Sequence, residues 1–302
     1  MRGLVLTVAM LIALAGQACS VRKFAINKIG DALAQGGSAY ESDEDVELVR
    51  GALPFGLKLI ESLIAESPKH KGVLFAASQG FTSFSYIDIQ QELDIAAISD
   101  LDAARQLRTR VRRLYLRGHI YGMTALELAH PGLSRQLEAD PKSAVKVLRK
   151  PDVPLIYWTA AGLGLAIAAS KDDVSMLARI PEVEALLDRA LELDPAWNSG
   201  ALHEFWIVLA AAKPGKPDAE KVQSHFVNAF ELSKGQRASL FVSFAESVCI
   251  PQQNREEFTR FIEKALAIDV DRTKEIRLLN LVAQRRARWL LGRVDDLILG
   301  GN

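Results

Sequence analysis

The sequence has little of what disulfide frameworks, metal centres or nucleic-acid interfaces require. Its 302 residues include two cysteines and five histidines. The cysteines are too few for a disulfide framework, and the spacing of a structural zinc site does not occur. Lysine and arginine number 37, as do aspartate and glutamate, so the formal net charge is zero. Because nucleic-acid binding depends on clustered cations that release counterions, we expect no metal, no cofactor and no nucleic-acid partner.

Catalytic motifs are missing as well. Gly162-Leu-Gly164 begins like a dinucleotide-binding loop, but no strand pattern precedes it and the third glycine is absent. His203-Glu204 begins like a zinc-protease motif, yet Ile207 stands where the second histidine must lie. Neither a Gly-x-Ser-x-Gly elbow nor a phosphate-binding P-loop occurs. The sequence therefore predicts a protein that is not an enzyme.

What the sequence does contain is helical pattern, which predicts an all-α protein. The stretch Asp152–Ser170 is apolar on every side, as is typical of a helix buried all round. We expect Asp152 to cap this helix and Pro154 to occupy its first turn. A membrane span is the competing interpretation because the length nearly suffices. Polar and aromatic residues crowd one end, however, and amphipathic helices flank it. A separate helix with an aromatic cluster is predicted over Val73–Gln91.

One short sequence motif, an alanine followed by mostly apolar residues and an aspartate or serine, recurs near the ends of the predicted helices. It begins at Ala190, Ala229 and Ala265, at intervals of 39 and 36 residues, and looser versions begin at Ala125 and Leu63. The two intervals lie near the period of about 34 residues of tetratricopeptide (TPR) repeats. Stacked helix pairs bury apolar faces that no pair can bury alone. The sequence thus predicts stacked antiparallel helix pairs in an irregular TPR-like array, with its concave side as the default binding surface.

The N-terminus has the features of a secretory signal. A short positive start precedes an apolar run, and Ala18 stands directly before Cys19. We expect a signal peptide over residues 1–18, acylation of Cys19, a lipid-anchored tether over residues 19–41 and a TPR-like helical domain over residues 42–302. Gly16 is atypical for a lipidation motif, and cleavage by ordinary signal peptidase is the alternative. After cleavage Cys249 has no intramolecular cysteine partner, and we expect it to be a small core residue.

Several polar and aromatic residues lie within otherwise apolar helices and are candidates for ligand or partner binding. They are Tyr86, Gln90, Tyr157, Trp158, His203, Glu204, Gln284, Arg285 and Trp289. The competing interpretation of each is a satisfied core contact, a helix–helix hydrogen bond or a surface ion pair. Tyr157 and Trp158 are the strongest candidates, because their polar atoms lie near a helix N-terminus that favours an anionic group.

Seven ordered segments carry a resemblance to a known family. They are Glu47–Phe55, Ala77–Phe81, Asp152–Trp158, Lys171–Asp173, Arg189–Asp194, Gly200–Phe205 and Ala283–Leu291. Together they closely resemble the T-component proteins (TatT) of tripartite ATP-independent (TRAP) transporters, from about residue 40 to 295. The weak lipidation motif is the one departure.

The resemblance implies a non-enzymatic lipoprotein of the bacterial periplasm that assembles as a homotrimer and is held at the membrane only by its lipid anchor. The implied partner is the periplasmic substrate-binding protein of a TRAP transporter. Binding of a small or hydrophobic ligand beside that partner is left open. A general TPR-type envelope lipoprotein that acts as a scaffold for protein–protein interaction is the alternative function.

Overall fold

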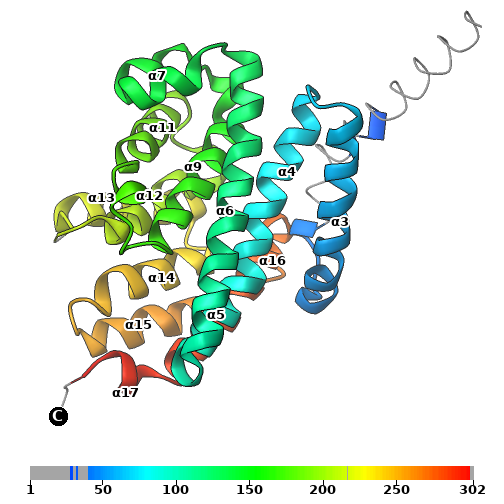
Figure 1. The fold of residues 1–302 in the computed structure, drawn as a ribbon. Coiled ribbons are helices and arrows are strands. Elements are labelled where there is room, and N and C mark those ends of the chain that lie inside the picture. Colours follow the sequence, from blue (N-terminus) through cyan, green and yellow to red (C-terminus); the bar gives the residue numbers. More distant parts are fainter. Residues whose placement is uncertain (1–27, 30–31, 33–39, 216, 300–302) are drawn as a thin grey trace, which may run out of the picture.

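The computed structural model describes residues 28–29, 32, 40–215 and 217–299. The predicted signal peptide, Cys19 and most of the predicted tether lie outside these residues. Across the described ranges the chain forms helices and turns, and no strand occurs among them (Figure 1). The predicted all-α class is confirmed, whereas the TPR-like repeat remains a prediction.

The helices follow one another with short connections. The N-terminal half contains α3 (Val46–Glu66), α4 (Lys71–Phe84), η1 (Ser85–Ile89), α5 (Gln90–Ser99), α6 (Leu101–Ala129), α7 (Leu133–Ala139), α8 (Pro141–Ala144), η2 (Val145–Val147), η3 (Lys150–Asp152) and α9 (Val153–Ala168). The C-terminal half contains α10 (Val174–Leu177), α11 (Ile180–Leu193), η4 (Trp197–Gly200), α12 (Ala201–Ala212), α13 (Ala219–Ser233), α14 (Ala238–Phe244), η5 (Ala245–Cys249), α15 (Arg255–Leu266), η6 (Lys274–Ile276), α16 (Arg277–Leu291) and α17 (Val294–Leu297). The η1 and η5 segments are π-helical turns, and the other η segments are 3₁₀ turns.

Helix α9 is the centre of the larger core, as the sequence predicts. It packs against α4, α6 and α11, and its small residues let these helices approach closely. A β-carbon added at Gly162 would lie 2.8 Å from the backbone nitrogen of His119 and 2.9 Å from the carbonyl oxygen of Tyr115. Only a glycine allows α6 to cross α9 at this separation. Helix α9 has 16 residues, and no helix in the described ranges is both long and apolar enough to span a membrane.

The predicted cap of α9 is wrong in one respect. Pro154 lies in the first turn as expected, but Asp152 makes no side-chain hydrogen bond to the first amides of α9. Its Oδ2 instead accepts a hydrogen bond from the backbone nitrogen of Arg149 at 2.8 Å and lies 2.9 Å from Nε2 of His130. The 3₁₀ turn η3 stands directly before α9, and the Asp152 carboxylate accepts from the amide of Arg149 at the start of that turn. Asp152 therefore caps η3 and not α9.

Two main cores fill the molecule, and the two ends of the helical array meet. The larger core extends from Leu57 to Leu209 and the second from Ile207 to Ile298, so α12 contributes to both. A small third cluster joins Val49 of α3 to two residues of α16. Ion pairs of Arg277 with Glu44 and of Arg285 with Glu47 tie the same helices together. The last long helix thus packs against the first, and Figure 1 shows α16 beside α3.

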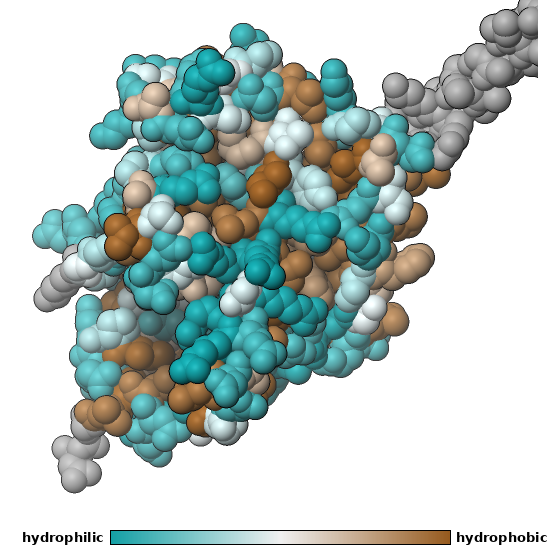
Figure 2. Space-filling view, in the orientation of Figure 1, coloured by the Kyte–Doolittle hydropathy of each residue, from teal (hydrophilic) through white to brown (hydrophobic). Residues whose placement is uncertain are grey.

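The outer face of α3 is apolar. Leu48, Phe55 and Leu59 are 62%, 75% and 44% exposed. Figure 2 shows hydrophobic side chains along the edge of the molecule where α3 lies in Figure 1. Exposed apolar stripes of this kind often mark interaction surfaces.

Candidate functional site

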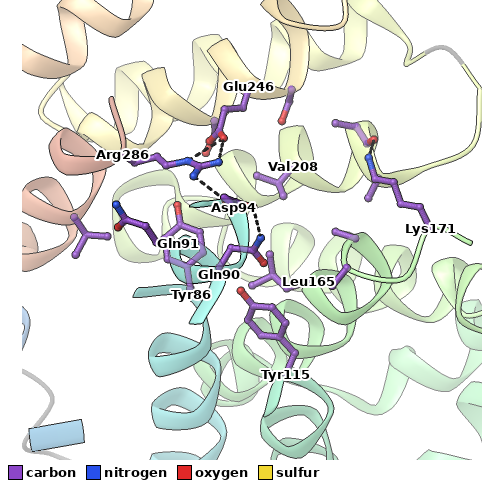
Figure 3. Close-up of a pocket in the computed structure, with 17 residues that line it drawn as sticks. Tyr86, Gln90, Gln91, Asp94, Tyr115, Leu165, Lys171, Val208, Glu246 and Arg286 are labelled. Carbon is purple, nitrogen blue, oxygen red and sulfur yellow. Dashed lines mark hydrogen bonds and ion pairs between the residues drawn. The ribbon is translucent and has the colours of Figure 1, made fainter. Parts of the chain in front are cut away.

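A cavity of about 340 Å³ lies between the N-terminal and C-terminal helices, where the ends of the array approach each other. Its walls come from η1, α5, α6, α9, α12, η5 and α16 (Figure 3). The polar residues that line it are Tyr86, Gln90, Gln91, Asp94, Tyr115, Lys171, Ser243, Glu246, Ser247 and Arg286. The apolar ones are Leu165, Ala168, Ala169, Val208, Ala211, Ala212 and Val282. Its size lies at the lower end of the range for small-molecule sites, about 300–1,000 Å³.

Both π-helical turns lie at this cavity. Residues 85–89 form the first and residues 245–249 the second, and each follows a buried phenylalanine of an α-helix. The second residue of each turn, Tyr86 or Glu246, lines the cavity. A π turn holds one residue more than the α-helical turn it replaces, which changes the direction of the side chains that follow, and such turns are frequent at functional sites. The cavity wall thus contains two π-helical turns, one from the N-terminal half of the chain and one from the C-terminal half.

A charged cluster forms one wall of the cavity. The guanidinium of Arg286 donates to Oε1 of Glu246 from Nη2 at 2.6 Å and from Nε at 3.1 Å, and its Nη1 lies 2.7 Å from Oδ2 of Asp94. Gln90 donates to the other Asp94 oxygen at 3.1 Å. Figure 3 shows these contacts joining α5, η5 and α16. Burial lowers the pKa of Arg286, but the two carboxylates raise it by more, so that the guanidinium stays charged.

The pKa of Asp94 shows that burial in this cluster disfavours the charged form of its carboxyl group. Burial raises it above the ordinary value of an aspartate, and the attraction of Arg286 only partly opposes that shift. The charged wall therefore depends on Arg286 to keep Asp94 and Glu246 together in a part-buried place. Each of the three residues comes from a different helical segment, so the cluster joins the N-terminal part of the chain to the C-terminal part.

Two tyrosine hydroxyls face the same cavity. Tyr115 is fully buried, and its hydroxyl oxygen has no hydrogen-bond partner among the described residues. Burial raises the pKa of Tyr115 well above the usual value, with smaller contributions from Tyr86 and Asp94. The pKa of Tyr86 is also raised, first by burial and then by Glu246. Both phenols are therefore neutral at physiological pH and can donate or accept a hydrogen bond.

A second polar cluster lies beside the cavity and is joined to it through Ser243. Arg237 is 3% exposed and donates from Nε to Oε2 of Glu204 at 2.6 Å. Ser243, which lines the cavity, donates to the other oxygen of Glu204 at 3.3 Å. Ser239 adds a hydrogen bond of 3.1 Å to the same carboxylate. This buried and satisfied ion pair positions α12 against α14.

The structure brings two of the predicted candidates, Tyr86 and Gln90, into the cavity. Tyr157 and Trp158 pack in an aromatic group with Trp197 and Phe205, in which the ring centroids of Tyr157 and Trp197 are 4.7 Å apart. Burial, followed by the charge of Glu204, raises the pKa of Tyr157 to about 12. These two aromatic residues are among the contacts that hold α9, η4 and α12 together.

The remaining candidates lie elsewhere. The Nδ1 atom of His203 is 2.9 Å from Nδ1 of His225. Glu204 belongs to the second polar cluster, with Arg237. Gln284 donates to the backbone carbonyl groups at the end of α15, at 2.8 Å for Ile268. Arg285 pairs with Glu47 on the outside. Trp289 packs under the guanidinium of Arg286, 4.4 Å from the ring centroid. No group of three or more histidine, cysteine, aspartate or glutamate residues in the described ranges could hold a metal ion.

Sequence reasoning missed Asp94 and Tyr115 as site residues, and it did not separate Arg286 from the basic run in which it stands. Tyr86, Gln90 and Asp94 follow one another at intervals of four, which places them on one helix face. That spacing was a usable signal for Asp94. Arg286 stands beside Arg285 in a run of basic residues, and nothing in the run distinguishes the buried arginine from the exposed one. Tyr115 is isolated on α6, and its role depends on which helices cover it.

Comparisons with known proteins agree with the resemblance. The family model described as TRAP transporter T-component matches residues 42–298. A relative described as an uncharacterized protein of Treponema pallidum (strain Nichols) is 29% identical over 269 residues, which cover 86% of this chain and 82% of the relative. The family match includes every residue of the cavity and both of the main cores. The chain therefore belongs to the TRAP transporter T-component family.

Proposed function

We propose that this protein is a non-enzymatic accessory component of a TRAP transporter that binds the transporter's periplasmic substrate-binding protein. The observation that carries the proposal is the family match over residues 42–298, which is nearly the whole predicted mature chain. An accessory role agrees with the helical fold of the described residues and with the cavity that they hold.

We further propose that the cavity is the place where this accessory component holds a small ligand. Two features support this. Its wall combines apolar side chains with a larger number of polar ones, so that it can offer a small molecule both contact area and hydrogen bonds. Its polar groups come from α5, α6, η5 and α16, so one bound molecule can contact both ends of the helical array.

The setting of the protein is proposed from its sequence and its family. We propose a location in the bacterial periplasm, attachment to the membrane through a lipid on Cys19, and assembly as a homotrimer. The exposed apolar face of α3, with Leu48, Phe55 and Leu59, supports a protein–protein contact of this kind, because such a face is unfavourable in water. The face of the molecule that Figure 2 shows is otherwise of mixed polarity.

The test of the proposed function is co-purification. The tagged protein is isolated from its own bacterium, and the untagged periplasmic substrate-binding proteins of TRAP transporters in that bacterium are sought in the eluate by mass spectrometry. A tagged TPR-type lipoprotein of the same envelope serves as the control. Enrichment of the binding protein with this chain and not with the control is the expected result. Equal recovery with both, or recovery of envelope assembly proteins in its place, would favour a general scaffold.

A further inference from the structure

The Tyr115 hydroxyl is the least explained polar group at the cavity. The residue is 0% exposed, and its oxygen has no hydrogen-bond partner in the part of the chain that the structure describes. A buried polar atom without a partner destabilises a fold, so natural proteins retain few of them. Figure 3 shows the hydroxyl end of Tyr115 directed toward Gln90 and Leu165, on the cavity side of α6. A ligand atom within the cavity is the partner that this position offers.

The charges that line the cavity cancel. Asp94 and Glu246 carry two negative charges, and Arg286 and Lys171 carry two positive ones. Arg286 is already paired with both carboxylates, and Nζ of Lys171 lies 3.4 Å from the carbonyl oxygen of Ala211 at the other end of the cavity (Figure 3). Among the described residues Lys171 donates only to a neutral carbonyl, but it lies away from Tyr115. An ion placed beside Tyr115 would therefore bring a charge for which the nearby charged groups, Asp94, Glu246 and Arg286, are already paired with one another. Burial of an uncompensated charge is strongly unfavourable.

A further part of the wall is aliphatic. Leu165 and Ala168 of α9 and Val208 and Ala211 of α12 line the cavity. Figure 3 shows Leu165 near the Tyr115 ring. These side chains offer contact area to hydrocarbon and no hydrogen bonds. Apolar groups that pack there leave water, which contributes favourably to binding in proportion to the area removed.

We propose that the cavity binds an uncharged amphipathic organic molecule, whose hydroxyl or carbonyl oxygen pairs with the Tyr115 hydroxyl while its aliphatic part packs against Leu165 and Val208. This inference rests on the proposed function, in that it takes the cavity to be the ligand site. A carboxylate in the same place meets Asp94 and Glu246, and an ammonium group meets Arg286. The raised pKa of Tyr115 keeps its proton in place, so the phenol is available to donate to the ligand oxygen.

The test uses three probes of equal length and different charge, namely hexanamide, hexanoate and hexylammonium. Each is titrated into the purified mature chain, and binding is followed by ligand-observed NMR. Saturable binding of hexanamide is expected, with the two ions weaker by roughly tenfold or more. Tyr115→Phe should weaken hexanamide binding by roughly threefold to tenfold, because one uncharged hydrogen bond is lost.

A matched variant separates the binding role from folding. Tyr121, on the same helix but outside the cavity, donates from its hydroxyl to Glu61 at 2.7 Å. Tyr121→Phe should lower the melting temperature and leave hexanamide binding unchanged. Tyr115→Phe should not lower the melting temperature, because its hydroxyl bonds to no described residue.

Three outcomes would overturn the proposal. They are binding of either ion as tight as that of hexanamide, an unchanged affinity in Tyr115→Phe, and no saturable binding of any probe at millimolar concentration. Co-purification of the periplasmic binding protein is scored separately. If it succeeds while the probes fail, the proposed accessory function stands and the inferred ligand class is wrong. If the probes bind as expected and the binding protein does not, the accessory function fails.

Discussion

Three glycine-to-alanine substitutions test how closely α9 packs against its neighbours, because each adds one methyl group. Gly162, Gly164 and Gly51 all lie within helices, so each change brings the same gain in helix propensity of about 1 kcal/mol. They differ in what the new methyl group meets. At Gly51 nothing lies within 4 Å, whereas at Gly164 the nearest atoms belong to the Phe205 ring at 2.8 Å and to the side chain of Val183 at 3.3 Å.

Gly162 is the severe case, because its neighbours are backbone. The nitrogen of His119 at 2.8 Å and the carbonyl oxygen of Tyr115 at 2.9 Å cannot rotate away, so α6 must move relative to α9. Overpacking of a tight core costs about 1–3 kcal/mol and sometimes more. After the gain in propensity we expect Gly162→Ala to lose about 1–2 kcal/mol. Gly164→Ala should lie near neutral because side chains can adjust, and Gly51→Ala should gain about 0.5–1 kcal/mol.

The assay is urea unfolding followed by circular dichroism, with the three variants measured beside the wild type. The decisive quantity is the difference between variants, because propensity and the unfolded state are nearly the same for each. If Gly162→Ala proves as stable as Gly51→Ala, then α6 and α9 do not cross at this separation. In that case the position of Tyr115, which follows from the same crossing, would also be wrong.

Three further predictions concern His119, the neighbouring residues Arg285 and Arg286, and Cys19. His119 is buried between the carbonyl oxygen of Thr159, 3.0 Å from Nδ1, and the guanidinium of Arg179, 3.1 Å from Nε2, with Glu182 beyond. Burial is the main cause that lowers its pKa from 6.5 to about 4. The unfolded chain therefore binds a proton at a pH where the folded chain does not, and up to about 3 kcal/mol of stability should be lost as the pH falls from 6.5 toward 4. Urea unfolding should show a smaller loss over this range in His119→Gln. Arg286→Gln leaves Asp94 and Glu246 without their partner and should cost about 3 kcal/mol. Arg285→Gln breaks an exposed pair and should cost less than about 1 kcal/mol in the same unfolding assay. Palmitate labelling should be present in the wild type and absent in Cys19→Ser, and equal labelling would show that Cys19 is not acylated.

The sequence was informative about the helices and the central element of the fold. An apolar stretch without a polar face, Asp152–Ser170, can be stable in water only if other helices surround it, and α9 is surrounded. The cap was predicted wrongly, because a 3₁₀ turn before the helix takes the carboxylate of Asp152 for itself. Helical periodicity over Val73–Gln91 gave no sign of the π turn at residues 85–89, which shifts the face on which later side chains lie.

The site was harder to predict because it depends on distant parts of the chain. Tyr86 and Gln90 were accessible to reasoning, since polar groups on an apolar helix need partners. The opposite wall of the cavity was not, because Glu246 and Arg286 reach it only when the last helices pack against the first. The same packing decides that Arg286 is buried while Arg285, one residue earlier, pairs on the surface with Glu47. Local sequence carries no information on that choice.

The most direct test of the account is solute uptake in the native bacterium. The solute is the one whose uptake is lost when the membrane subunits of the transporter are deleted. Strains that lack this chain are complemented with the wild type, Tyr115→Phe or Tyr121→Phe at matched expression. We expect that deletion reduces uptake, that the wild type and Tyr121→Phe restore it, and that Tyr115→Phe restores it only in part. Normal uptake in the deletion strain would contradict the proposed role in transport, and full restoration by Tyr115→Phe would contradict the role of the cavity.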